Sequence, residues 1–203
     1  PSVPPAPRSD QGARVRDVLR HVDLLRLNFG VFCLHFILMA LFVVVPGMLS
    51  ELGGYGSANL WKVYLPVILV SFVVMVPAVF YTETRHRHKQ TLDAAVIVLV
   101  IMLVLMAALS HSFAGVVGAL IGFFVAFNIL EALQPSLVSR VAPPEYKGLA
   151  LGFYNTTQSL GIFLGGAIGG LLAANGQAPT VLLAAAALAF AWYMAARGFK
   201  SAS

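Results

Sequence analysis

The sequence predicts an all-α integral membrane domain with six transmembrane helices. Hydrophobic residues make up 59% of the 203 residues, charged residues make up only 10%, and the mean hydropathy is +0.86. A soluble domain of this size could not bury so much apolar surface in one core, so lipid must solvate much of the chain. The apolar residues also fall into six separate stretches, and the cations lie almost entirely between them.

Each apolar stretch is close to the roughly 20 residues that a helix needs to cross the hydrocarbon core of a bilayer. Pro66, Pro77 and Pro135 interrupt these stretches. Membrane helices tolerate such prolines because neighbouring helices satisfy the freed backbone groups. The six predicted spans are residues 27–49, 63–81, 92–109, 113–137, 149–173 and 180–196.

The distribution of Lys and Arg predicts how the domain lies in the membrane, because cytoplasmic loops are enriched in these residues. If both termini are cytoplasmic, the outer loops contain only Lys62. The sequence therefore predicts an N-in, C-in topology. The cations then placed in the cytoplasm are Arg8, Arg14, Arg16, Arg20, Arg26, Arg85, Arg87, Lys89, Arg140, Lys147, Arg197 and Lys200.

Residues 1–26 are predicted to form a cytoplasmic linker before the first span. The first ten residues are rich in proline and lack the apolar core and cleavage site of a signal peptide. Residues 14–26 mix cations with apolar residues at helical spacing. Two interpretations fit this pattern equally well: an amphipathic helix on the inner leaflet, or a solvated linker helix.

The fifth span carries glycines at regular spacing. Gly161, Gly165 and Gly169 fall on one helical face, and Gly166 and Gly170 lie beside it. Small residues four positions apart let two membrane helices approach closely. We therefore favour tight packing against a neighbouring helix over direct contact with a substrate.

Together with Gly152, these glycines resemble the antiporter signature of the major facilitator superfamily, G-x8-G-x3-G-P-x2-G-G. Gly166 stands where the family has proline. In the family this signature lies on the fifth helix of the first half, and the eleventh helix is its counterpart in the second half.

A second family signature indicates which half this chain resembles. The first loop of the first half carries G-x3-D-R-x-G-R-R, and residues 79–88 align with it. Glu83 fits the acidic place and Arg87 fits one basic place, but Val79 and His86 replace the glycines. Second halves usually show such a degenerate loop, so the resemblance assigns residues 27–203 to helices seven to twelve, the C-terminal half-domain.

The resemblance covers nearly the whole chain after Arg20 and implies a secondary active transporter of the bacterial inner membrane. It implies proton-coupled efflux of a small molecule, in which two halves rock about a central site. The implied partners are the missing N-terminal six-helix half, membrane lipids, protons and a small-molecule substrate. No cofactor is implied.

Glu131 is the candidate for proton exchange. Counting about 1.5 Å per residue from the middle of each span, it lies roughly 9 Å to the cytoplasmic side of the membrane centre, and His35 lies roughly 4–5 Å to the same side. An ionised carboxylate at this depth is costly unless it is paired or hydrated. The resemblance places both helices along the central cavity, with Asn128 on the same face as Glu131. The alternative is a structural hydrogen bond between two helices.

A polar run in the inner part of the fifth span must face protein or water. Its members bond to neighbouring helices or to a substrate, and Tyr154, Asn155 and Gln158 are the candidate cavity residues among them. The run comprises Tyr154, Asn155, Thr156, Thr157, Gln158 and Ser159.

Other functional classes find little support in the sequence. An intramembrane enzyme needs an HExxH pair, a serine with a base or paired aspartates, and none is present. The histidines near Glu83 fit a positive inner loop better than a metal site, and the cations do not follow the pattern of a nucleic-acid-binding surface. A six-helix scaffold or accessory subunit without transport activity stays open as the alternative.

Overall fold

The computed structural model describes residues 15–16, 18, 20–175 and 178–199, and six long helices account for most of them. Two short 3-10 turns, η1 (Ser57–Asn59) and η2 (Pro144–Tyr146), precede α3 and α6. The six helices are α2 (Val22–Gly53), α3 (Trp61–Thr84), α4 (His88–Ala108), α5 (Phe113–Val141), α6 (Lys147–Asn175) and α7 (Ala178–Ala196).

Each helix contains one predicted span and is long and apolar enough to cross a membrane, so the predicted fold class is confirmed. The predicted bounds differ slightly, because polar residues extend most helices past their apolar stretch. The third span is the exception, since its last residue, Leu109, follows the end of α4.

The segment before the first span differs in part from the prediction. Part of residues 14–26 lies outside the described residues. However, α2 already begins at Val22, so the last five residues of the predicted surface helix belong to the first transmembrane helix. Asp23 and Arg26 form an ion pair in its first turns, with Nη1 of Arg26 2.9 Å from Oδ1 of Asp23.

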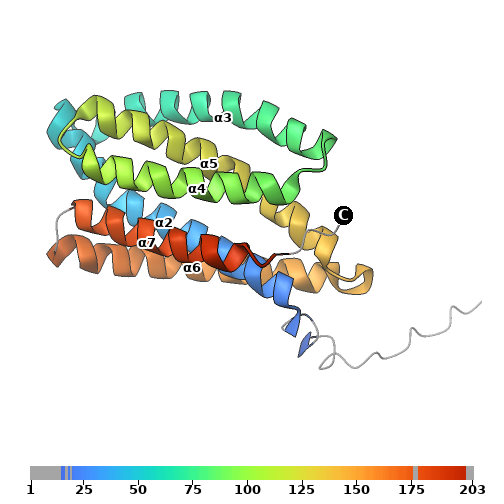
Figure 1. The fold of residues 1–203 in the computed structure, drawn as a ribbon. Helices are drawn as coiled ribbons and strands as arrows, with labels where there is room; N and C mark the ends of the chain where they lie inside the picture. The colour runs from blue at the N-terminus through green and yellow to red at the C-terminus, as the bar shows by residue number, and fades with distance from the viewer. Residues whose placement is uncertain (1–14, 17, 19, 176–177, 200–203) are drawn as a thin grey trace, which may run out of the picture.

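The helices run side by side in two groups (Figure 1). In one group α3 and α4 pack on α5, and in the other α2 lies against α6 and α7. Helix α4 joins the groups because it packs against both α5 and α7. The most extensive contact in the described chain lies between α2 and α6.

Helices α3 and α6 are the least buried elements. Only 17% of the residues in the most apolar part of each are buried within the chain, compared with 56% in α2. Many of their exposed side chains are nevertheless large and apolar, such as Val73 and Phe80 on α3 and Phe163 on α6. These faces must therefore meet lipid or further protein rather than water.

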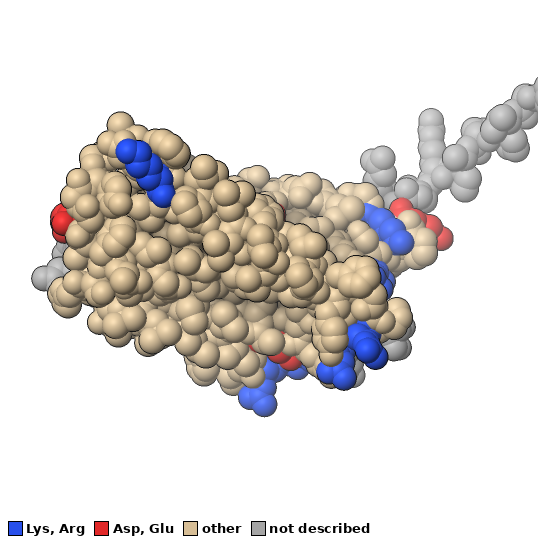
Figure 2. All heavy atoms as spheres, turned by 90° about the horizontal axis from the view of Figure 1, so that it is seen from above, with Lys and Arg blue, Asp and Glu red and all other residues tan. Residues whose placement is uncertain are grey.

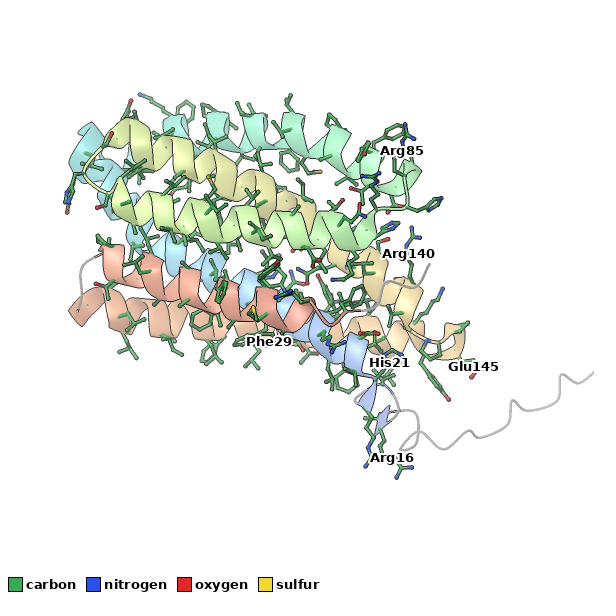
Figure 3. All side chains as sticks on the ribbon, viewed as in Figure 1. Arg16, His21, Phe29, Arg85, Arg140 and Glu145 are labelled. Carbon is green, nitrogen blue, oxygen red and sulfur yellow. The ribbon has the colours of Figure 1, made fainter. Side chains whose placement is uncertain are left out.

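Charged side chains gather toward one end of the bundle. Figure 3 shows Arg16, His21, Arg85, Arg140 and Glu145 at that end, and most blue atoms in Figure 2 also lie toward it. The segregation agrees with the charge pattern in the sequence, and the orientation relative to the cytoplasm stays a prediction.

Candidate functional site

A polar cluster joins three helices in the interior of the bundle. It consists of His35 on α2, Glu131 on α5 and Gln158 on α6. Nε2 of Gln158 lies 2.7 Å from Nε2 of His35 and 3.4 Å from Oε1 of Glu131. Nε2 of His35 lies 3.4 Å from Oε2 of Glu131. The structure thus brings together three of the six residues that the sequence indicates for the cavity.

The hydrogen bonds of His35 identify which ring nitrogen carries the hydrogen when the ring is neutral. Nδ1 lies 3.1 Å from the carbonyl oxygen of Val31, and a carbonyl only accepts, so Nδ1 holds the hydrogen. Nε2 is then an acceptor, which suits the amide N–H of Gln158. A second proton on Nε2 would turn this atom into a donor and make Glu131 its natural partner.

Burial divides the cluster into an inner and an outer part. The His35 side chain is 5% exposed, whereas the Glu131 side chain is 37% exposed in this chain. Oε2 of Glu131 accepts no hydrogen bond from the described residues. Pro135 has no N–H, so it also leaves the backbone carbonyl of Glu131 without its helical donor. The cluster therefore retains two acceptors on Glu131, a buried carboxylate oxygen beside His35 and a backbone carbonyl.

The other predicted cavity residues take no direct part in this contact. Nδ2 of Asn128 donates to Oγ of Ser71 on α3 over 2.8 Å, so the polar stripe expected on α5 divides between two neighbouring helices. Asn155 is exposed. Tyr154 is 2% exposed, and its hydroxyl has no hydrogen-bond partner among the described residues.

The glycine face of α6 packs directly on the backbone of α2. A Cβ atom at Gly161 would lie 2.6 Å from the carbonyl oxygen of Phe32, and one at Gly169 would lie 2.9 Å from Cα of Ala40. A Cβ at Gly165 would overlap the carbonyl oxygen of Phe36. Because backbone atoms cannot move aside, any larger residue would separate the helices. The close approach of α6 to α2 brings Gln158, which lies one turn before Gly161, within reach of His35.

The remaining glycines of the motif have no such neighbour. A Cβ at Gly152 or Gly170 would meet nothing within 4 Å, and one at Gly166 would touch only the end of Met39 at 3.9 Å. The packing predicted for these three is therefore absent from the described part of the chain, because none of them lies on the face that meets the backbone of α2.

A second Glu–His pair lies at the cation-rich end. Oε2 of Glu83 lies 2.7 Å from Nη2 of Arg140, and Oε1 of Glu83 lies 3.2 Å from Nε2 of His88. These contacts tie the end of α3 to α4 and α5. The sequence indicated Glu83 but not Arg140, because 57 residues separate them in the chain. The guanidinium of Arg87 instead lies 6.0 Å from the ring of Tyr81.

The backbone at His86 explains the glycine of the loop signature. His86 has a φ of 53°, a left-handed conformation that glycine adopts readily and other residues adopt at a cost. His86 thus occupies the position of a signature glycine and has a conformation that suits glycine.

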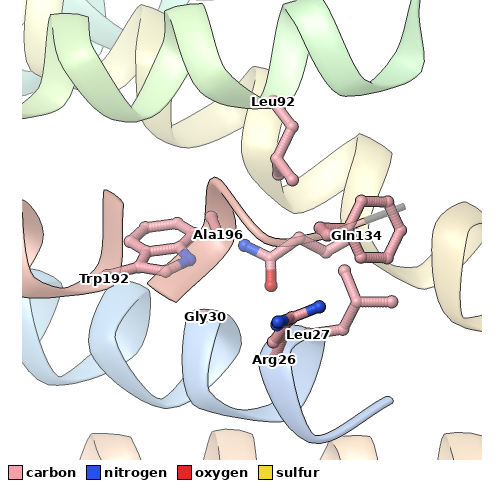
Figure 4. A pocket seen from close by; sticks show the side chains of 8 residues that line it. Arg26, Leu27, Gly30, Leu92, Gln134, Trp192 and Ala196 are labelled. Carbon is pink, nitrogen blue, oxygen red and sulfur yellow. The ribbon is translucent and has the colours of Figure 1, made fainter. Parts of the chain in front are cut away.

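A small cavity lies between α2, α4, α5 and α7 (Figure 4). The side chain of Gln134 on its wall is fully buried, and neither amide atom has a hydrogen-bond partner among the described residues. The cavity, of about 10 Å³, has room for one water molecule. Sequence reasoning overlooked Gln134, although it follows Glu131 by three residues in the same apolar run.

Within the described residues no three His, Cys, Asp or Glu side chains come close enough together to hold a metal ion. Cys33 is buried in α2.

Comparison with known proteins identifies the family. The family model described as Major Facilitator Superfamily matches residues 27–201. The inner membrane transport protein YajR of Escherichia coli K12 is 42% identical over 184 residues, which are 90% of this chain and 40% of that protein. An uncharacterised transporter of Buchnera aphidicola subsp. Acyrthosiphon pisum is 33% identical over 69% of this chain and 36% of its own length.

A more distant relative is the multidrug resistance protein MdtH of Proteus mirabilis, which is 27% identical over 74% of this chain and 35% of that protein. The chain thus spans less than half the length of each of these curated relatives. The family and the names of its relatives point to a transporter and not to an enzyme. This multi-pass membrane chain belongs to the major facilitator superfamily.

Proposed function

We propose that this chain is the second six-helix half of a proton-coupled transporter that exports a small molecule by antiport. The observation that carries the proposal is the contact of His35, Gln158 and Glu131 within the membrane-spanning part of the bundle. Intramembrane acids are costly to maintain, and they commonly mark proton or substrate pathways.

Proton exchange at this cluster changes the contacts between three helices. With His35 neutral, Gln158 donates to both His35 and Glu131. A proton on Nε2 of His35 leaves two donors facing each other, so Gln158 must turn its amide or move away. Glu131 then takes over as the partner of His35. The protonation state thereby biases how α6 sits against α2 and α5, and this is the coupling that alternating access requires.

In this proposal, an N-terminal six-helix half forms the opposite wall of a central transport cavity. Alternating access needs two units that rock about a central site, and this chain supplies one. The largely unburied faces of α3 and α6, together with the open side of Glu131, are the surfaces that such a half would meet.

Two further observations support export across the inner membrane. The glycine spacing of α6 resembles the antiporter signature, and one relative is named a multidrug resistance protein. The YajR relative is named an inner membrane protein. We therefore place the chain in the inner membrane of a bacterium, with a small organic molecule as its substrate.

The test is Glu131→Gln in the complete transporter, reconstituted in proteoliposomes. Glutamine keeps the shape and hydrogen bonds of Glu131 but cannot take up and release a proton. Flux driven by a proton gradient should fall to background, while expression and substrate binding persist. Proton-driven flux at the wild-type rate would leave Glu131 a structural role only.

Asn128→Ala is the matched control, because Asn128 lies one turn earlier on α5 and bonds to α3 instead. Its loss should leave the proton dependence of transport intact. If neither the wild-type transporter nor this control moves any substrate under a proton gradient, a scaffold or accessory role would replace transport.

A further inference from the structure

A groove between α3 and α5 lies at the end of the bundle opposite the cation-rich end. It has a volume of about 210 Å³, and its residues include Val67 on α3 and Val117 and Ile121 on α5. Tyr55 and Lys62 contribute the polar groups. The groove is therefore apolar along its length and polar at one end.

Lys62 provides an isolated positive charge at this end of the bundle. It is the one Lys or Arg there among the described residues, and it is exposed. No carboxylate in the described part of the chain pairs with it, and its ammonium lies 6.0 Å from the ring of the exposed Trp61. An unpaired cation beside an exposed tryptophan is typical of the headgroup region of a membrane.

The backbone beside Lys62 also offers a free acceptor. Pro66, which lines the groove one turn later, has no N–H, so the carbonyl of Lys62 lacks its helical donor. This carbonyl points along the helix toward Pro66 and lies on the same side of α3. The mouth of the groove therefore combines a positive charge with a hydrogen-bond acceptor.

The dimensions favour a lipid chain over a whole small molecule. Pockets for small molecules usually enclose about 300–1,000 Å³, more than this groove has. From Lys62 to Val70 the groove follows α3 for about 12 Å, from the headgroup region into the hydrocarbon region. Val70, at the inner end, is 45% exposed.

We propose that this groove binds one anionic phospholipid. Its phosphate pairs with the ammonium of Lys62, a headgroup hydroxyl donates to the Lys62 carbonyl, and an acyl chain lies along Val70 and Val117. Phosphatidylglycerol has this chemistry. Phosphatidylethanolamine fits less well, because its ammonium is repelled by Lys62. On the predicted topology, the lipid belongs to the outer leaflet.

The first experiment compares lipid binding to the complete transporter by native mass spectrometry with added phosphatidylglycerol. Lys62→Gln should weaken the tightest binding event about fivefold, the effect of one cation at a membrane surface. Lys147→Gln, which removes an exposed cation at the other end, should leave that event unchanged. Equal binding by Lys62→Gln and the wild type would overturn the proposal, as would equal affinity for phosphatidylethanolamine.

The second experiment identifies what covers the groove. A photoreactive benzoylphenylalanine at position 70 of the complete transporter, irradiated in vesicles that contain phosphatidylglycerol, should yield a phospholipid adduct. A crosslink to another helix of the transporter would show that protein fills the groove and would refute the lipid site. A lipid adduct that persists in equal amount after Lys62→Gln would show that the headgroup is not recognised.

Discussion

The two Glu–His pairs of this chain use the same side chains in different surroundings. In the interior, Glu131 meets His35 at 3.4 Å, and the third partner is the neutral amide of Gln158. At the cation-rich end, Glu83 meets His88 at 3.2 Å, and the third partner is Arg140. The two pairs therefore differ in their third partner, which is a neutral amide in one and a cation in the other.

Arg140 is a permanent cation, and its ion pair with Glu83 links α5 to the end of α3. The central cluster contains no such cation among the described residues. Its charge depends on protons alone, so a single proton can rearrange it. Under the proposed function, the central Glu–His pair acts as a proton switch, and the pair at the cation-rich end acts as a structural link.

The largest expected effect comes from separating the helices that form the central cluster. Gly165→Leu places a side chain against the carbonyl of Phe36 and should destabilise the protein by about 3 kcal/mol or more. We expect little folded transporter by size-exclusion chromatography and no proton-driven flux. Gly170→Leu is the matched control on the same helix, where a Cβ meets nothing within 4 Å.

If Gly165→Leu folds and transports like the wild type, close packing does not hold Gln158 beside His35. If Gly170→Leu is equally damaging, another part of the transporter must pack against that side of α6.

A smaller effect is expected from converting the Glu83 cluster at the cation-rich end into a copy of the central one. Arg140→Gln leaves Glu83 with a histidine and an amide. Because Glu83 and Arg140 are 41% and 42% exposed, their ion pair should contribute about 0.5 kcal/mol. Thermal unfolding of Arg140→Gln, Glu83→Gln and the double variant gives the coupling between them.

Proton-driven flux should persist in all three variants, in contrast to Glu131→Gln. Loss of proton dependence in Glu83→Gln would contradict a purely structural role for Glu83. A coupling energy of zero between Glu83 and Arg140 would show that their ion pair does not stabilise the protein.

An effect of similar size is expected at the loop beside the Glu83–Arg140 ion pair. His86→Gly should relieve the strain of a positive φ but also increase the entropy of the unfolded chain, for a net gain of about 0.5 kcal/mol. His86→Ala keeps the strain, so it should be about 1 kcal/mol less stable than His86→Gly. Thermal unfolding of the two variants measures this difference, and identical midpoints would contradict the strained conformation.

Much of the fold could be predicted from the sequence, because the signals are local. A membrane helix satisfies its own backbone hydrogen bonds, so length and apolar composition are enough to reveal each span. The spacing of Gly161, Gly165 and Gly169 likewise predicted that they share one helical face, which is the face that meets α2 in the structure.

The tertiary structure decided which neighbours these groups meet. Periodicity predicts the face on which a residue lies but not the helix that faces it. Asn128 therefore bonds to Ser71 and not to a site shared with Glu131, and Gln158 becomes the third member of the central cluster. Arg140, Gln134 and the groove at Lys62 depend on contacts between distant parts of the chain, and no local pattern in the sequence records such contacts.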